Sequence, residues 1–281
     1  KMKKYVQIYL GGTKGRGIKI QYIQKKIERY IDKIDGIIVG WSLEIEIYKW
    51  LSEYTKNRHV KLYLWFPVLA EFDKIKNFVA IKDVENEGIN SNKFDQDENF
   101  SFYCPSATTT FENIKNIYKI YFSEIKFDGI FLDRIRFPSF TIGENALFTC
   151  CCNECMKVYE SRGWTRERIR NIKYGVEHSE TRTLPMGIRK YFDGRYEFEK
   201  AEMREYLEAR MELITAIVRK TAFYFKSQGM EVGLDLFAPF LAPFVGQDYR
   251  ELSQCADFIK PMLYRCTYTP AGFDYELDEM V

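Results

Sequence analysis

Residues 127–138 have the sequence Phe-Asp-Gly-Ile-Phe-Leu-Asp-Arg-Ile-Arg-Phe-Pro. The segment 130–132 is apolar, which suits a strand buried on both faces, and charged residues follow abruptly from Asp133. Because side chains alternate along a strand, Phe131 and Asp133 share one face. A parallel strand that ends in a carboxylate is typical of α/β barrels, which present their chemistry at the C-terminal face. We therefore expect Asp133 at a barrel rim, although it could instead cap the next loop or pair with Arg136.

Similar strands recur along the chain and alternate with helical patterns. Strands are expected at 5–10, 35–41, 60–67, 127–138, 231–239 and 257–264, and helices at 20–34, 44–54, 110–125 and 195–226. This alternation predicts an α/β fold, a (β/α)8 TIM barrel around a parallel sheet. Six strand–helix units are visible. Only 17 residues follow Tyr264, whereas two further units need roughly 60 residues. Either the barrel is incomplete at the C-terminus, or the sequence stops before the native end.

The expected organisation is one TIM-barrel-like catalytic domain over residues 1–281. An insertion at 139–195 follows the fourth strand and carries a cysteine cluster. The polar segment 70–105 is expected to be a long loop, and long ordered loops are often functional lids.

Composition limits the classes of partner. Lys and Arg number 42 against 40 Asp and Glu, so charge does not indicate a nucleic-acid-binding protein. No run approaches the roughly 18 apolar residues of a membrane span. The odd count of 7 cysteines is unlike a secreted disulfide framework and favours the cytoplasm. Secretion stays open, since a signal peptide could have been removed, and the sequence does not indicate an oligomeric state.

Trp41 and Trp65 fall at equivalent positions, each at the end of a predicted strand. Aromatic side chains at a barrel mouth can stack on the apolar faces of sugar rings. They can equally plug the top of the barrel, and the sequence leaves both interpretations open.

The stretch at 127–138 resembles the Asp-Gly-Ile-x-x-Asp-x-Ile-Arg-Phe/Tyr-Pro signature of glycoside-hydrolase-like TIM barrels, which are glycosidases distantly related to the α-amylase-like clan. Two flanking regions are also similar to this family. Cys104-Pro105-Ser106 and the helix that follows resemble the family's segment before its fourth strand. Leu234-Asp235-Leu236-Phe237, together with Gly246-Gln247-Asp248, resembles the family's fifth-strand motif. Residues 257–264 resemble the strand-six block, Asp-x-Ile-x-Pro-Met-x-Tyr. The blocks occur in the family's order over 104–264, whereas residues 1–70 fit only as barrel strands.

The sequence departs from the family pattern in three ways. The insertion lies outside the motif, Lys260 replaces a small polar residue, and no seventh or eighth strand can be found. The resemblance implies a glycoside hydrolase acting on a poly- or oligosaccharide that it does not identify. It also implies that Asp133 is the nucleophile and Asp235 the acid/base.

Glycoside hydrolysis needs two carboxyl groups across the scissile bond, and Asp133 and Asp235 are the best pair. Both end consecutive predicted strands. If these strands are neighbours about 4.8 Å apart, their carboxyl groups lie near the roughly 5–5.5 Å of a retaining enzyme. A carbohydrate-binding barrel without catalysis is the alternative, using Trp41, Trp65 and the long loop. A third hypothesis is another barrel hydrolase or lyase that acts through Lys260.

Three further side chains are candidates for substrate binding. Arg136 lies just beyond the fourth strand and could hold Asp133 ionised. If Tyr264 points inward, so does Lys260, and Tyr264 could donate a hydrogen bond to the nucleophile or the sugar. A lysine inside a barrel is costly unless a carboxylate pairs with it.

The insertion contains Cys150-Cys151-Cys152-Asn153-Glu154-Cys155. The spacing of Cys152 and Cys155 occurs in zinc knuckles, with Cys150 as a third candidate ligand and His178 as a fourth. A structural zinc ion, a disulfide and plain thiols all stay open. No other cofactor is expected.

Overall fold

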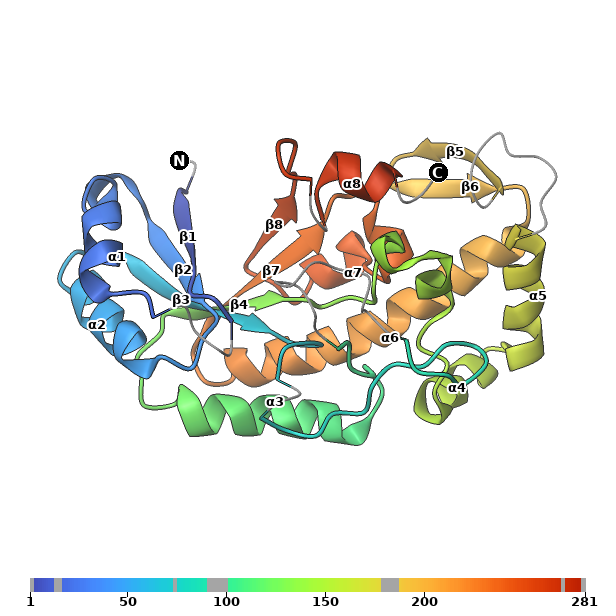
Figure 1. The fold of residues 1–281 in the computed structure, drawn as a ribbon, viewed down its shortest axis with the longest axis horizontal. Helices are drawn as coiled ribbons and strands as arrows, with labels where there is room; N and C mark the ends of the chain where they lie inside the picture. The colour runs from blue at the N-terminus through green and yellow to red at the C-terminus, as the bar shows by residue number, and fades with distance from the viewer. Residues whose placement is uncertain are drawn as a thin grey trace.

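The chain forms a six-stranded parallel sheet with helices packed around it (Figure 1). The computed structural model describes residues 3–12, 17–72, 75–89, 101–177, 187–268 and 271–278. The strands lie in the order β1 (Tyr5–Tyr9), β2 (Gly36–Gly40), β3 (Lys61–Pro67), β4 (Gly129–Asp133), β7 (Glu231–Phe237) and β8 (Phe258–Met262). Every neighbouring pair is parallel. The expected α/β fold is confirmed.

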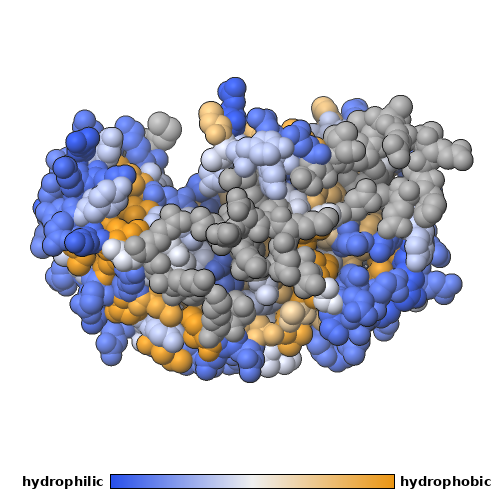
Figure 2. All heavy atoms as spheres, in the orientation of Figure 1, coloured by the Kyte–Doolittle hydropathy of each residue, from blue (hydrophilic) through white to orange (hydrophobic). Residues whose placement is uncertain are grey.

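The sheet curls so strongly that side chains of its two edge strands, β1 and β8, come into contact. The ring of Tyr5 on β1 stacks on that of Phe258 on β8, with 5.1 Å between ring centroids. The outline of the molecule is notched between the N-terminal strands and β8 (Figure 2). The described residues supply six of the eight expected strands. The structure is therefore a partial TIM-like barrel, and a closed (β/α)8 barrel is not shown.

Aromatic side chains fill the concave face of the sheet. Ile38, Tyr63 and Phe131 form a buried cluster, and the rings of Phe131 and Phe258 stack 5.9 Å apart. Gly233 on β7 lies against both rings, because a Cβ there would be 2.3 Å from Phe258 and 2.7 Å from Phe131. Only glycine fits at this place. Phe131 thus points into the barrel, and the residue two positions further along β4 shares its face.

The convex face is covered by amphipathic helices, as the sequence pattern predicts. They are α1 (Ile20–Ile27), α2 (Ile45–Lys56), α3 (Thr108–Tyr121) and α6 (Ala201–Lys226). On α3 the buried positions recur at helical spacing, as in Phe111, Ile114 and Tyr118. The first helix is shorter than the expected 20–34, because it ends at Ile27 and a 3-10 turn η1 (Ile31–Lys33) follows. The short helices α7 (Tyr249–Ser253) and α8 (Phe273–Asp278) follow β7 and β8.

The chain leaves the sheet between β4 and α6 and returns through the long α6 (Figure 1). It forms η2 (Phe140–Ile142), η3 (Glu144–Phe148), α4 (Asn153–Glu160), α5 (Arg166–Glu177) and an antiparallel hairpin of β5 (Ile188–Phe192) and β6 (Arg195–Phe198). The helix expected from residue 195 therefore begins only at Ala201. Asp193 and Gly194 both have positive φ, as the tight turn of a two-residue hairpin requires. The division of the chain into one domain with an insertion at 139–195 stays a prediction.

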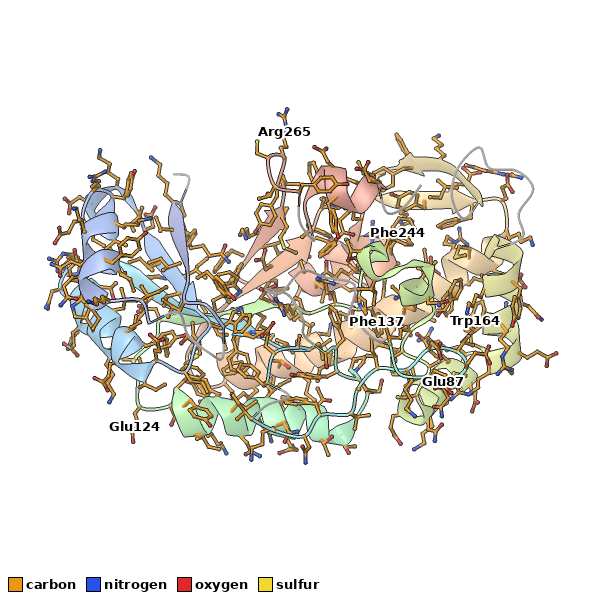
Figure 3. The ribbon with its side chains drawn as sticks, in the orientation of Figure 1. Glu87, Glu124, Phe137, Trp164, Phe244 and Arg265 are labelled. Carbon is orange, nitrogen blue, oxygen red and sulfur yellow. The ribbon has the colours of Figure 1, made fainter. Side chains whose placement is uncertain are left out.

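A buried arginine joins this segment to the rest of the fold. Arg210 on α6 is fully buried, and its guanidinium donates to the carbonyl oxygens of Ala146, Thr149 and Phe244. The guanidinium also lies 4.7 Å above the ring of Phe137. Figure 3 labels Phe137 and Phe244, together with Trp164 of the inserted segment. Satisfying the donors of a buried cation in this way offsets part of its desolvation.

Candidate active site

Asp133 and Asp235 lie side by side on neighbouring strands. Strands β4 and β7 pair in parallel with Leu132 beside Leu234, so the next residue of each strand is an aspartate. Asp133 follows the inward-facing Phe131 by two positions, and Asp235 follows Gly233 by two. The two carboxyl groups therefore share the concave face at the C-terminal edge of the sheet. Both side chains are buried, with relative exposures of 9% and 2%.

Two donors hold the carboxylate of Asp133. The indole Nε1–H of Trp65 donates to Oδ2 at 2.8 Å, and the backbone N–H of Arg134 donates to Oδ1 at 2.5 Å. Arg134 has a φ of 51°, in the left-handed region that few non-glycine residues adopt, so the chain turns sharply directly after Asp133. These two hydrogen bonds fix the orientation of the Asp133 carboxyl group.

The two arginines beyond β4 have other contacts. The guanidinium of Arg134 forms an ion pair with Glu71 and lies 5.2 Å above the ring of Trp41. Arg136 donates to the Phe137 carbonyl oxygen at 3.0 Å, and its guanidinium lies 4.5 Å above the ring of Phe237. The expected part of Arg136 in substrate binding stays a prediction.

Asp235 faces a cation and a second polar network. The ammonium of Lys260 lies 3.0 and 3.2 Å from its two carboxylate oxygens, and the same ammonium donates to the Tyr264 hydroxyl oxygen at 2.7 Å. The expectation that a lysine inside the barrel needs a carboxylate partner is thus confirmed. Gln7 on β1 lies near enough to Asp235 across the barrel to lower the pKa of that carboxyl group.

Burial sets the proton affinity of Asp235. Desolvation, together with the negative charge of Asp133, raises the pKa of Asp235 from 3.8 to about 7, against the lowering effects of Lys260 and Gln7. Burial alone would lower the pKa of Lys260, but Asp235 and Tyr264 together raise it above its ordinary value. Near neutral pH, Asp235 therefore exchanges its proton readily while Lys260 stays charged.

Aromatic rings form a row beside Asp133. The ring of Tyr9 lies 5.7 Å from that of Trp41 and 5.8 Å from that of Trp65. Gly40, at the end of β2, pairs with Trp65, so Trp41 lies one residue beyond the level of Trp65 and the two positions are not equivalent in the register. Trp41 is only 4% exposed, whereas Tyr9 is 39% exposed. Trp41 is therefore buried behind the row, whereas the ring of Tyr9 is accessible to solvent. Sugar stacking at Trp41 and Trp65 stays a prediction.

Sequence reasoning missed Gln7, Tyr9 and Glu71. Gln7 had a signal, because it is a polar residue inside the aromatic and β-branched segment 5–9, and Tyr5 and Tyr9 share its face. Glu71 had none, since only the folded loop after β3 brings it to Arg134.

A cleft of about 870 Å³ lies elsewhere on the molecule, between α6, the β5–β6 hairpin and α7. Its described lining includes Arg195, Glu212 and Asp248 but neither strand-end aspartate. The candidate site is therefore distinct from this cleft.

The structure also gathers the cysteines of the insertion. Cys150, Cys152 and Cys155 lie together with Cys104, which comes from the segment before α3. Cys104 was not among the expected ligands, because it lies far from the others in sequence. His178, the expected fourth ligand, lies outside the described residues.

Comparison with solved structures places glycoside hydrolases among the proteins of similar fold. An α-L-fucosidase, isoenzyme 2 from Paenibacillus thiaminolyticus, matches with a TM-score of 0.55 and 13% identity, over 91% of this chain and 35% of the fucosidase. An α-N-acetylgalactosaminidase from Bifidobacterium bifidum matches with a TM-score of 0.48 and 9% identity, over 98% of this chain and 39% of that one. A β-N-acetylhexosaminidase from Bacteroides fragilis matches with a TM-score of 0.46 and 12% identity, over 83% of this chain and 42% of the hexosaminidase.

The match to the fucosidase shows that the chain has a glycosidase-like fold, and the chain spans about a third of that enzyme. The family models and the curated proteins searched contain no match to this sequence. None of the helices in the described part of the chain combines the length and apolar character needed to cross a membrane.

Proposed function

We propose that the protein is a retaining glycoside hydrolase in which Asp133 is the nucleophile and Asp235 the general acid/base. The observation that carries the proposal is the pair of buried carboxyl groups side by side on β4 and β7, at the C-terminal edge of a curled parallel sheet. Neighbouring strands lie about 4.8 Å apart, which suits the roughly 5–5.5 Å between the carboxyl groups of retaining enzymes.

The different surroundings of the two aspartates support different roles. Asp133 accepts hydrogen bonds from Trp65 and from a backbone N–H, which hold its carboxyl group in a fixed orientation for attack on the sugar. Asp235 has a pKa of about 7, so that near neutral pH a large fraction of it holds the proton that a leaving sugar oxygen needs.

The charge of Asp133 couples the two steps of such a reaction. In the first step Asp235 protonates the leaving oxygen, and Asp133 forms a covalent bond to the sugar. Asp133 then no longer carries the negative charge that raises the pKa of Asp235. The pKa of Asp235 then falls, so that Asp235 stays ionised and free to accept a proton from the attacking water.

Lys260 acts in this proposal as a positioning residue. Its ammonium bridges Asp235 and Tyr264, and its raised pKa keeps it charged. A charged lysine is a poor nucleophile or base, which disfavours the hypothesis of a reaction through Lys260 itself.

The comparison supports the proposal at the level of fold. Among the proteins named above, the α-L-fucosidase has the highest TM-score, 0.55, and this likeness concerns the fold alone. The relationship to the α-amylase-like clan, the sugar and the linkage are not implied by this likeness.

Turnover of a panel of aryl glycosides and oligosaccharides tests the proposal. We expect Asp133→Asn and Asp235→Asn each to lose at least about 100-fold in kcat/KM on whichever substrate the wild type cleaves. Asp128→Asn, at the opposite end of β4, is the matched control and should stay within about twofold of the wild type. The anomer released first, followed by proton NMR, should be the one present in the substrate. Release of the opposite anomer, or full activity in both site variants, would refute the assigned roles.

A carbohydrate-binding barrel without catalysis is the second candidate. It is favoured by the aromatic row and by the Lys260 ion pair, which engages the carboxylate of Asp235. Under this alternative, calorimetry detects a sugar ligand, the wild type does not cleave it, and Tyr9→Ala weakens binding more than Asp235→Asn does. The reaction through Lys260 predicts instead that Lys260→Met abolishes turnover while both aspartate variants keep it.

A further inference from the structure

Four buried cysteines converge on one point outside the candidate active site. The sulfurs of Cys104, Cys150, Cys152 and Cys155 all lie within 4.8 Å of one another, and all four residues are buried. Cys104 Sγ is 3.2 Å from Cys152 Sγ and 3.5 Å from Cys155 Sγ. The convergence of four sulfurs, and not of two, is the feature to be explained.

The spacing fits a single metal ion. A disulfide joins two sulfurs at about 2.05 Å, and all four of these cysteines are free. A zinc ion bound by four thiolates at about 2.3 Å in a tetrahedron holds them about 3.8 Å apart. A four-iron cluster bonds each thiolate to a different iron and would keep the sulfurs further from one another.

Local structure positions three of the four cysteines. Cys152 is the N-cap residue of α4, and Cys155 lies in its first turn, so the Cys-x-x-Cys spacing directs both sulfurs to one side. The hydroxyl of Ser106 lies 3.5 Å from Cys155 Sγ and is a donor within reach of a thiolate. On the other side, the Cys104 backbone N–H donates to the Val79 carbonyl oxygen at 2.7 Å, and the hydroxyl of Thr110 donates to the Cys104 carbonyl oxygen at 2.8 Å.

We propose that Cys104, Cys150, Cys152 and Cys155 bind one Zn²⁺ ion in a closed structural site. Four protein thiolates complete the tetrahedral coordination of zinc and leave no position for a substrate or an activated water. The ion would join the segment between β3 and α3 to the segment between β4 and α6. Binding would release the protons of the four thiols, since thiolates are the ligands.

This link would brace the edge of the sheet that carries Asp133. The backbone N–H of Val68 donates to the Asp133 carbonyl oxygen at 2.9 Å, and the backbone N–H of Tyr103 donates to the Leu69 carbonyl oxygen at 2.9 Å. Tyr103 immediately precedes Cys104. The proposed ligand Cys104 is therefore one residue from Tyr103, whose backbone bonds to the segment that follows β3 and contacts Asp133.

The chain supplies its own matched control. Cys151 lies between two proposed ligands and is equally buried, but its sulfur lies 3.4 Å from the Phe148 carbonyl oxygen and not in the group of four. Cys266 is exposed and serves as a second control.

The experiment is the metal content of the full chain, produced in zinc-supplemented medium and measured by inductively coupled plasma mass spectrometry. We expect about one zinc per chain in the wild type, in Cys151→Ser and in Cys266→Ser. Cys104→Ser and Cys152→Ser should lose at least about three quarters of it. A chelator should lower the melting temperature of the wild type and change that of the Cys152→Ser variant much less.

A second measurement does not depend on the folding of any variant. Cobalt replacing zinc in the wild type should give the visible and near-ultraviolet absorption of a tetrahedral tetrathiolate. A wild type that binds neither zinc nor cobalt, a Cys104→Ser variant that keeps its zinc, or iron found in place of zinc would overturn the proposal. These outcomes do not depend on glycosidase activity, so the two proposals fail separately.

Discussion

The substitution Asp235→Asn tests the site without any knowledge of a substrate. Asparagine has nearly the shape of a protonated aspartate but cannot ionise. The wild type must bury a carboxylate, 2% exposed, whenever that group loses its proton, and the variant never does. The two proteins should therefore differ in how their stability depends on pH.

The sign follows from proton linkage. The pKa of Asp235 is about 7 in the folded protein, above the ordinary 3.8. The folded protein thus binds this proton more tightly than the unfolded chain, and the resulting stabilisation is complete below about pH 4. It is lost as the pH rises through about 7. Each pH unit between the two values corresponds to about 1.4 kcal/mol, so the loss amounts to about 4 kcal/mol.

Urea unfolding followed by circular dichroism at several pH values between 4 and 8 measures this loss. The free energy of unfolding of the wild type, minus that of Asp235→Asn, should fall by about 4 kcal/mol across the range. The subtraction removes the titration of other groups, and any constant effect of the amide on Lys260 cancels. Glu46→Gln, an exposed carboxylate on α2, should follow the wild type. Parallel profiles for the wild type and Asp235→Asn would refute the assigned environment of Asp235.

Three further predictions concern activity and packing. If Asp235 is the acid, kcat/KM of the wild type falls on the alkaline side with an apparent pKa of about 7 in a pH–rate profile, and a flat profile from pH 6 to 9 would contradict this assignment. Trp65→Phe keeps an aromatic ring but removes the donor to Asp133, so kcat should fall roughly 10- to 100-fold in steady-state assays, whereas an unchanged kcat would mean that the bond is not used. Arg210→Leu leaves three carbonyl oxygens without their donor and should lower the free energy of unfolding by roughly 3 kcal/mol or more in urea titrations, while Arg204→Leu on the exposed face of α6 should change it by less than about 0.5 kcal/mol.

The sequence predicted those parts of the site that depend on strand order and alternation. Asp133 ends β4 and Asp235 lies beside it on the neighbouring parallel strand β7, so their neighbourhood follows once the sheet is recognised. The cost of burying a lone ammonium likewise predicted that Lys260 needs a carboxylate. Because side chains alternate along a strand, the inward direction of Phe131 predicted that Asp133, two positions later, also points inward.

The features that escaped prediction depend on contacts between distant segments. Cys104 joins the other cysteines only because two loops meet beyond the ends of β3 and β4. Gln7 reaches Asp235 only because the sheet curls. The predicted helix began at residue 195, but residues 195–198 form β6, because the turn at Asp193 and Gly194 pairs them with β5.

The contacts of Arg210 have a consequence for how the protein unfolds. One side chain on α6 holds backbone groups of the inserted segment, at Ala146 and Thr149, and of the loop after β7, at Phe244. Detaching the insertion from the barrel would leave this guanidinium buried without its acceptors, or would require α6 to move away from the sheet. The two regions should therefore melt as one cooperative unit, and amide hydrogen exchange near Thr149 should slow to the rate of global opening.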